Sequence, residues 1–317
     1  AEQARAKGFQ LLGNFDDQQA EQPPHFQSLP LRREQLRSLG WMQRQEDEAE
    51  AFDLYGTQIE IDPGDGHSVE DEARGANRFG FCYELRWRTS HRVRGGILGD
   101  AIGYGKTATT IGLIDSRRGN RGPVPEPFGP YFFQSGATLI LAPANLLDQW
   151  LAEFSKFLAP ADGGALPLKV VPVKTAANIK SLTVKEICKS DVIICSYRLF
   201  FSPVYRRRLL QFSGIDPGRL SESALCETKA DVVKLRSLTR RFRTNPREVE
   251  WGHRLPQVGE ELEVVTEPMS LRFPVLEQFW WARIVFDEFH ELEAMMGKAA
   301  QFHSLRSLCG NCRWGLT

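Results

Sequence analysis

The sequence has no apolar run long enough to cross a bilayer, so no membrane-spanning helix is expected. Its first residues, AEQARAKGFQLLGNF, lack the apolar core of a secretory signal. It also lacks an internal repeat and a net charge, because 40 basic residues balance 40 acidic ones. This balance neither favours nor excludes nucleic acid, since a protein that moves along DNA needs only a local basic surface. The chain does not begin with Met, and we expect it to be a piece of a longer protein.

Cysteine is sparse, with six residues scattered along 317. This is not a disulfide framework in a chain of such length, and a reducing compartment fits better. Cys309 and Cys312 form a CxxC pair. Because no second pair lies nearby, a turn between a helix and a strand is favoured over a zinc or redox site.

Apolar residues make up 42% of the chain, which is enough for the core of one large α/β domain or two smaller ones. Residues 1–28 are rich in Gln, Pro and charge and predict a loose lead-in. The apolar spacing over 29–46 predicts an amphipathic helix. Clusters of Gly, Pro and Asp predict turns over 56–75, and residues 79–89 have the pattern of a strand or hairpin arm.

From residue 95 the sequence alternates between short apolar runs and helical segments. Helices are predicted from about Lys106 and over 145–157. Strands are predicted at 95–98, 137–143, 168–173, 191–197, 283–287 and 312–317. Continuous apolar strands separated by helices are typical of a parallel sheet covered on both faces, so we expect an α/β fold.

The segment DAIGYGKT, residues 100–107, lies between a predicted strand and a predicted helix, as a phosphate-binding loop requires. Gly103 and Gly105 would let the backbone turn tightly and point its N–H groups at phosphate oxygens. Lys106 would neutralise the β and γ phosphates, and Thr107 would place its hydroxyl on Mg²⁺. The N-terminus of the following helix would add positive charge to this anion site.

A second motif, WWARIVFDEFHEL at 280–292, places two acids at the end of a predicted strand. Asp287 would hold Mg²⁺ through water, and Glu288 would orient and deprotonate the attacking water. Ligands of open α/β sheets bind at the carboxyl ends of strands, so both motifs are expected at one edge. Alternatively, the acids merely occupy a helix N-terminus, where negative charge is favourable.

The stretch 204–247 carries eleven basic residues against four acidic ones. Its arginines include Arg206, Arg207, Arg208, Arg240, Arg241 and Arg243. A solvated, partly helical insertion is the favoured interpretation, and a contact with nucleic acid or another partner is the alternative.

In their order along the chain, these motifs resemble those of the first lobe of superfamily 2 helicase-like ATPases of the Swi/Snf class. The segments that resemble motifs I, Ia, Ib, II and the opening of III are GGILGDAIGYGKT (95–107), LILAPANLLDQWLAEFSKF (139–157), DVIICSYRLF (191–200), RIVFDEFHEL (283–292) and RWGLT (313–317). LRREQLRSLGWM (31–42) resembles the adenine-recognising segment. The resemblance covers about 29 to 317, interrupted by insertions.

The resemblance implies a RecA-like lobe over 95–317 with an insertion at about 201–275, preceded by an extension over 29–94. It implies ATP and Mg²⁺ as cofactors and a second lobe, beyond this chain, that supplies arginine fingers. The long spacing between motifs Ib and II is similar to the subgroup of the helicase-like transcription factor and post-replication-repair translocases. Members of that subgroup often carry a RING ubiquitin-ligase module. A nuclear location and double-stranded DNA or chromatin as partner are implied in the same way.

The resemblance also assigns roles to individual residues. The cofactor-binding residues would be Gln35, Asp100, Gly103, Tyr104, Gly105, Lys106, Thr107 and Ala108. Thr107 and Asp287 would hold the metal, and the catalytic residues would be Lys106, Asp287, Glu288 and His290. The residues on the phosphodiester backbone would be Asn145, Gln149, Ser196 and Tyr197.

Some residues keep a second interpretation. His290 would couple the ATP site to motif III, or it is a neutral histidine satisfied inside the domain. Trp150 is expected to pack in the core rather than to touch DNA. Phe289 replaces the small alanine of the family's box, and its ring could shift the acids. A non-catalytic interaction module and an RNA-dependent helicase with a DEAH-type box therefore stay as alternatives to a DNA translocase.

Overall fold

The computed structural model describes residues 13–48, 50–61, 82–101, 103–119, 122, 124–160, 164–249, 267–294 and 299–317. The turns predicted at 62–75 and the first part of the predicted lead-in, residues 1–12, lie outside the described residues. Among the residues that are described, no helix has both the length and the apolar character needed to span a membrane.

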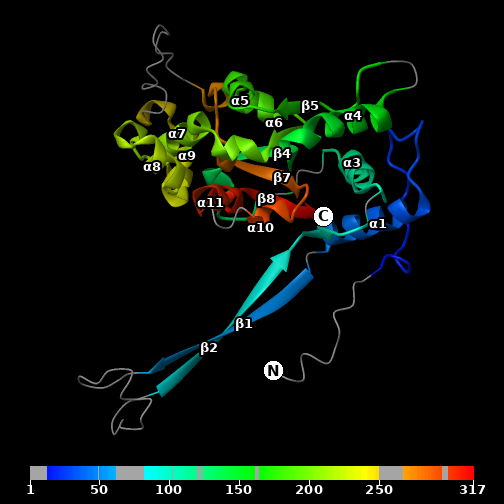
Figure 1. The fold of residues 1–317 in the computed structure, drawn as a ribbon, viewed down its shortest axis with the longest axis horizontal. Helices are drawn as coiled ribbons and strands as arrows, with labels where there is room; N and C mark the ends of the chain where they lie inside the picture. Colours follow the sequence, from blue (N-terminus) through cyan, green and yellow to red (C-terminus); the bar gives the residue numbers. More distant parts are fainter. Residues whose placement is uncertain are drawn as a thin grey trace.

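A six-stranded sheet forms the centre of the molecule (Figure 1). Its strands are β3 (Gly95–Leu98), β4 (Phe133–Ala142), β5 (Val170–Val173), β6 (Val192–Ser196), β7 (Phe279–Phe286) and β8 (Cys309–Leu316). All neighbouring pairs are parallel, in the order β3-β8-β7-β4-β6-β5. The strand before the phosphate loop and the strand before the acids are thus separated by β8 alone.

The central strands are buried on both faces, which explains their continuous apolar sequences. Successive side chains of a strand point to opposite faces. In β4, Leu139 and Leu141 therefore belong to one apolar cluster, while Ile140 and Ala142 belong to the other. This confirms the predicted α/β fold with a covered parallel sheet.

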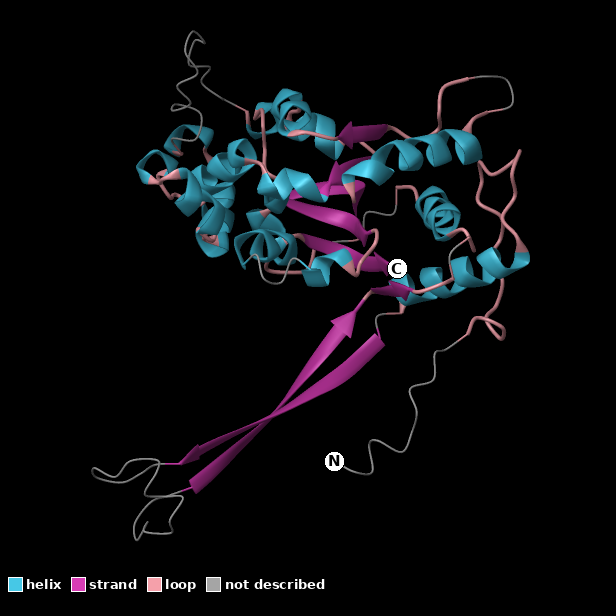
Figure 2. Cartoon of the chain, viewed as in Figure 1, coloured by secondary structure: helices cyan, strands magenta, loops and turns pink. Residues whose placement is uncertain are grey.

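Helices cover the two faces in two groups (Figure 2). One face packs against α1 (Arg33–Asp47), α3 (Lys106–Ser116) and α4 (Leu147–Leu158). The other packs against α5 (Ala176–Ser181), α6 (Val184–Cys188), α7 (Pro203–Phe212), α8 (Glu222–Glu227), α9 (Val232–Thr244), α10 (Glu291–Ala294) and α11 (Ala299–Ser307). In α4 the buried residues Leu147, Trp150 and Phe154 recur at helical spacing and form its inner face.

The predicted strands are all present, although three begin earlier than expected. β4 begins at Phe133, β7 at Phe279 and β8 at Cys309, and aromatic residues at the first two starts are buried. The predicted helices are confirmed as α1, α3 and α4. The pattern at 79–89 belongs to β2 (Cys82–Val93), which pairs antiparallel with β1 (Glu50–Ile61) in a long arm (Figure 1).

Within the described part of the lead-in, Phe26 is buried and stacks on Phe157 at 5.1 Å between ring centroids, while Phe15 is 80% exposed. Two other expectations about local structure were wrong. Residues 56–61 are part of β1 and not a turn, because β2 supplies a paired strand along that whole length. Cys309 and Cys312 lie within β8 rather than in a turn.

The CxxC pair does not form a site in the described part of the chain. Residues three apart in a strand point to opposite faces, so Cys309 and Cys312 cannot share a ligand. Burial raises the pKa of both thiols, that of Cys312 to about 12, and a buried thiol is unreactive. No group of three or more potential metal-ligating side chains occurs among the described residues.

The basic stretch forms helices α7, α8 and α9 and contributes to the core. Arg206 and Arg208 are buried, and Arg208 donates to the carbonyl oxygens of Phe273 and Arg272 at 3.1 and 3.2 Å. Its guanidinium also lies 4.0 Å from the centroid of the Phe212 ring. These two arginines are structural, so they are not part of a solvated surface that could bind a nucleic acid.

Candidate ATP site

Gln35 lies in the first turn of α1 and ties this helix to the phosphate loop. Its Oε1 accepts from the backbone N–H of Arg32 at 2.9 Å, and its Nε2 donates to the carbonyl of Tyr104 at 3.0 Å. A Cβ at Gly105 would displace Nε2 of Gln35 from this position, and the φ of 84° at Gly105 also favours glycine. The residue predicted to recognise adenine is therefore placed against the predicted phosphate loop.

The phosphate loop turns through two glycines with positive φ. Gly103 has φ 88° and Gly105 φ 84°, a region that L-residues with a side chain rarely adopt. Lys106 then opens α3, and its Nζ donates to the carbonyl of Asp100 at 2.6 Å. The loop thus curls around the lysine at a helix N-terminus, which is the geometry that favours an anion. Thr107 is half-buried beside it, and Ala108 is buried.

Asp287 follows the last residue of β7 and is held at several atoms. Its backbone N–H donates to the carbonyl of Leu141 at 2.8 Å. Its Oδ2 accepts from Trp150 Nε1 at 2.7 Å, and its Oδ1 accepts from the N–H of Glu288 at 3.1 Å. Burial raises the pKa of this carboxyl above its ordinary value, although the bond from Trp150 and the charge of Lys106 oppose the shift.

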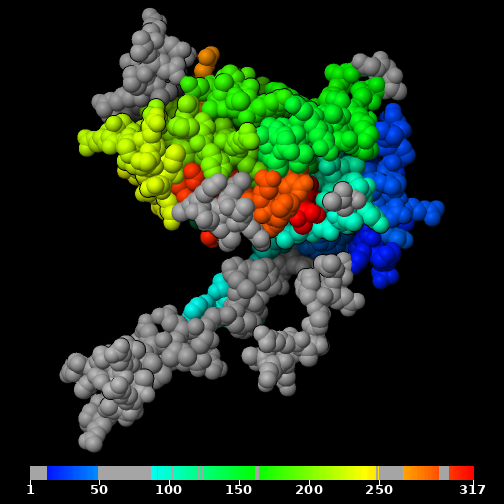
Figure 3. Space-filling model, viewed as in Figure 1, coloured from blue at the N-terminus to red at the C-terminus, as the bar shows by residue number. Residues whose placement is uncertain are grey.

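The two motifs meet at one edge of the sheet. Strand β8 lies between β3 and β7, and at its carboxyl end the Thr317 N–H donates to the carbonyl of Leu98 at 3.3 Å while the Phe289 N–H donates to the carbonyl of Leu316 at 2.7 Å. In Figure 3 the orange segment of the acids, the red chain end and the teal phosphate loop adjoin on one face. The nearby donors are a carboxylate and the Thr107 hydroxyl, and oxygen ligands of this kind suit Mg²⁺. The residues therefore fit a magnesium–nucleotide complex.

Glu288 and His290 lie on the exposed side of this edge. Glu288 has φ 50°, a strained backbone conformation for a residue with a side chain. His290 is exposed, and its Nδ1 lies 3.2 Å from Thr317 Oγ1 and 3.5 Å from Glu288 Oε2. The alternative of a histidine satisfied in the interior was wrong. His290 instead links the acids to the segment that resembles motif III.

A groove opens beside the acids, on the same edge of the sheet. It has a volume of about 360 Å³. Its lining residues are Pro143, Ala144, Asn145, Tyr197, Arg198, Phe201 and Glu291. Asn145 and Gln149, two residues predicted to contact nucleic acid, are exposed.

The other two predicted contacts, Ser196 and Tyr197, are buried and bonded within the chain. Ser196 Oγ accepts from the N–H of Arg198 at 3.1 Å, and the Tyr197 hydroxyl donates to the carbonyl of Asp287 at 2.9 Å. The exposed cation of this segment is Arg198, which sequence reasoning missed although it stands next to Tyr197 in the motif.

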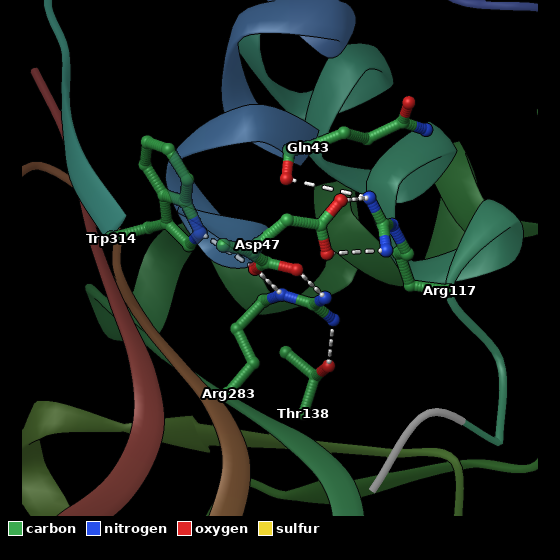
Figure 4. Close-up of polar contacts among 7 residues, drawn as sticks. Gln43, Asp47, Arg117, Thr138, Arg283 and Trp314 are labelled. Atoms are coloured by element: carbon green, nitrogen blue, oxygen red, sulfur yellow. Dashed lines mark hydrogen bonds and ion pairs between the residues drawn. The ribbon is translucent and has the colours of Figure 1, made fainter. Parts of the chain in front are cut away.

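A buried ion pair fixes α1 to the sheet at the end opposite to Gln35 (Figure 4). Arg283 donates through Nε and a terminal nitrogen to the two carboxylate oxygens of Glu46, both at 2.5 Å, and through its other nitrogen to Thr138 at 3.0 Å. Trp314 Nε1 adds a bond of 2.9 Å to Glu46. Burial works to raise the pKa of Glu46, but the charge of Arg283 and these bonds bring it below its ordinary value.

Comparison with known proteins gives concordant results. DNA (cytosine-5-)-methyltransferase DMT5 of Cryptococcus neoformans is 33% identical over 207 residues, which are 63% of this chain and 8% of that protein. DNA repair protein rad5 of Aspergillus fumigatus is 27% identical over 232 residues, 65% of this chain and 18% of that protein. DNA repair protein RAD5 of Candida albicans is 45% identical over 64 residues, 20% and 6% of the two chains.

Among solved structures, the SWI2/SNF2 ATPase core of Sulfolobus solfataricus in complex with dsDNA is similar over 95% of this chain and 34% of that chain. The TM-score is 0.42 and the identity 15%. The present chain spans less than a fifth of the length of the three relatives named above. A model of the SNF2-related domain matches residues 34–317, a range that includes α1, the phosphate loop, the acids and β8. The chain therefore belongs to the SNF2-related domain family.

Proposed function

We propose that this chain is the ATP-binding lobe of an ATP-dependent translocase on double-stranded DNA that acts on chromatin or in DNA repair. The observation that carries this proposal is the convergence of the Lys106 loop and the Asp287–Glu288 pair at one sheet edge. Membership of the SNF2-related domain family and the similarity to proteins named for DNA methylation and DNA repair support DNA over RNA.

The residues of the site have distinct roles in this proposal. Gln35 recognises the adenine, the loop that includes Gly103, Tyr104 and Gly105 wraps the phosphates, and Lys106 binds the β and γ oxygens. Thr107 and Asp287 hold Mg²⁺, which when bound neutralises charge on the phosphates. Glu288 orients and deprotonates the attacking water. His290 connects these acids to Thr317.

The groove beside the acids would take the DNA backbone. Arg198 supplies an exposed positive charge, and Asn145, which also lines the groove, supplies an exposed amide. Contacts of this kind track phosphates without reading bases, as a translocase requires. Gln149 would extend the track along α4.

The structure gives a non-catalytic module no specific support. Phe289 was its main argument, but the ring packs against the backbone of Gly315 and lies 6.4 Å from the ring of Phe286. It is therefore accommodated by the core. We infer a nuclear location from the same family membership. The second lobe and a RING module remain predictions.

The test is the ATPase activity of the full-length protein, measured with duplex DNA, with structured RNA and without nucleic acid. We expect stimulation by duplex DNA. Lys106→Ala should abolish nucleotide binding, while Glu288→Gln should bind nucleotide and not hydrolyse it. Normal hydrolysis by either variant, or stimulation by RNA alone, would refute the assignment.

A further inference from the structure

Two aromatic side chains donate hydrogen bonds to Asp287. Trp150, from α4, donates its indole N–H to Oδ2 at 2.7 Å. Tyr197, which follows β6, donates its hydroxyl to the backbone carbonyl of Asp287 at 2.9 Å. One donor thus orients the carboxylate and the other orients the peptide that leads into Glu288.

Both donors are buried, with exposed fractions of 1% for Trp150 and 2% for Tyr197. A buried hydrogen bond is stiff, because losing it would leave a polar group without a partner away from water. The peptide after Asp287 needs such support, since Glu288 has a φ of 50°. Strained backbone persists only where its surroundings impose it.

Each donor also belongs to a segment that reaches the groove. Asn145, which lines the groove, lies just before α4, the helix of Trp150, and Arg198 follows Tyr197. Tyr197 itself lines the groove together with Arg198. The atoms that fix Asp287 therefore belong to the two segments on which a bound phosphate backbone would press.

We propose that Trp150 and Tyr197 are positioning residues that hold the Asp287–Glu288 turn in its hydrolytic arrangement and transmit contact in the groove to it. This inference rests on the proposed function and deepens it. DNA that orders the motif Ia and Ib segments would hold both donors in place, so that the acids spend more time correctly oriented toward Mg²⁺–ATP. Neither side chain touches the nucleotide, and each acts through Asp287.

The test uses Trp150→Phe and Tyr197→Phe in the full-length protein. Tyr197→Phe removes only the hydroxyl donor, whereas Trp150→Phe removes the indole N–H together with part of the ring volume. Trp281→Phe is the matched control, because Trp281 lies on β7, the strand that leads to the acids, and is also fully buried. Its indole N–H donates one bond, to the carbonyl of Leu276 at 3.2 Å. Amide hydrogen exchange of residues 287–289 is measured without nucleotide, with and without duplex DNA.

We expect faster exchange at 287–289 in both variants and protection by DNA in the wild type only. DNA-stimulated kcat should fall about tenfold or more in Trp150→Phe, which loses a buried bond to a charged group, and about two- to tenfold in Tyr197→Phe, which loses a bond to a neutral carbonyl. The KM for ATP and the affinity for DNA should change less than about twofold. Trp281→Phe should leave all four quantities near their wild-type values.

The inference is overturned if exchange at 287–289 is unchanged in both variants, or if kcat falls equally in Trp281→Phe. The result is separable from the proposed function. A wild-type protein without DNA-stimulated hydrolysis would refute that function, whereas the exchange pattern would still report whether the two donors hold the turn.

Discussion

The missing side chain at Gly315 makes room for the ring of Phe289. A Cβ at Gly315 would lie 3.0 Å from Cγ and 3.1 Å from Cδ2 of that ring, closer than atoms normally pack. The Phe289 N–H is in turn fixed by the carbonyl of Leu316 at 2.7 Å, so the ring cannot easily move away. A bulky residue next to the acids is tolerated because of a glycine on the neighbouring strand.

Gly315→Ala should therefore lower the free energy of unfolding by about 1–3 kcal/mol, the usual cost of overpacking a core. Urea denaturation measures it. Gly99→Ala is the control, because its Cβ would meet nothing closer than 4.0 Å. Adding Phe289→Ala to Gly315→Ala should recover part of the loss, and a double variant no more stable than Gly315→Ala would contradict this packing.

Among the elements, α1 makes a buried ion pair and an exposed ion pair through adjacent residues at its C-terminal end. Glu46 and Arg283 have side chains less than a tenth exposed, whereas Asp47, which pairs with Arg117, is 54% exposed. Adjacent residues of one helix thus make ion pairs in different surroundings. Since Gln35 is at the other end of this helix, the buried pair also sets where the adenine contact lies.

Glu46→Leu should cost about 3–5 kcal/mol of stability, because it leaves the Arg283 charge buried without a partner. Asp47→Ala should cost less than about 1 kcal/mol, as exposed pairs do. The midpoints of urea denaturation of the two variants and of the wild type measure these losses of stability. The double variant Glu46→Leu with Arg283→Met should lose less than Glu46→Leu alone, and equal losses for Glu46→Leu and Asp47→Ala would count against the argument.

A buried acid, Glu277, connects helix α7 of the insertion (about 201–275) to the segment that leads into β7. Glu277 accepts from the Tyr205 hydroxyl of α7 at 2.5 Å. Burial raises its pKa to about 7, although the bond from Tyr205 and the charge of Arg206 oppose the shift. The folded state therefore keeps the proton at a pH where the unfolded chain has already lost it.

The contribution of Glu277 to the free energy of unfolding should therefore fall as pH rises from about 4.5 to 7. The total fall from this group is at most about 3 kcal/mol, and the contribution stays low at higher pH. Glu277→Gln, which cannot ionise, should remove this fall while keeping the Tyr205 bond. Unfolding free energies of both proteins from pH 5 to 8 give the comparison. The advantage of the variant should grow with pH, and a constant difference would show that Glu277 does not titrate in this range.

At the scale of the whole molecule, one edge of the sheet combines the phosphate loop, the acids and the groove, while the arm of β1 and β2 extends away from it (Figure 1). Arg208 and Arg283 make their hydrogen bonds inside the core. We propose that arginine fingers for the γ-phosphate come from a second lobe, as the family resemblance implies.

This 317-residue chain by itself should bind Mg²⁺–ATP weakly and hydrolyse it hardly at all, because an arginine finger changes such rates by about 10³–10⁵-fold. Nucleotide affinity by fluorescence and phosphate release, with and without duplex DNA, are the measurements. Lys106→Ala gives the baseline for binding. Robust DNA-stimulated ATP turnover by the isolated chain would contradict this prediction.

The local patterns were enough to predict the parallel α/β sheet. They also led to the proposed roles of Lys106, Thr107, Asp287 and Glu288, which stay predictions. Each of these depends on a short stretch of chain, such as a strand that ends in acids or a glycine turn that opens a helix. The strand at 50–61 was missed because its regularity comes from pairing with β2 and not from its own sequence.

Only the tertiary structure decided which polar groups meet across the fold. The basic run at 204–247 gives no sign that Arg206 and Arg208 are buried, and nothing near Trp150 or Tyr197 indicates that Asp287 accepts from both. Hydrogen bonds join atoms that lie 90 and 137 positions apart in these cases. A sequence records which donors and acceptors exist. The packing of the whole sheet and its helices determines which of them are removed from water and must therefore form hydrogen bonds with one another.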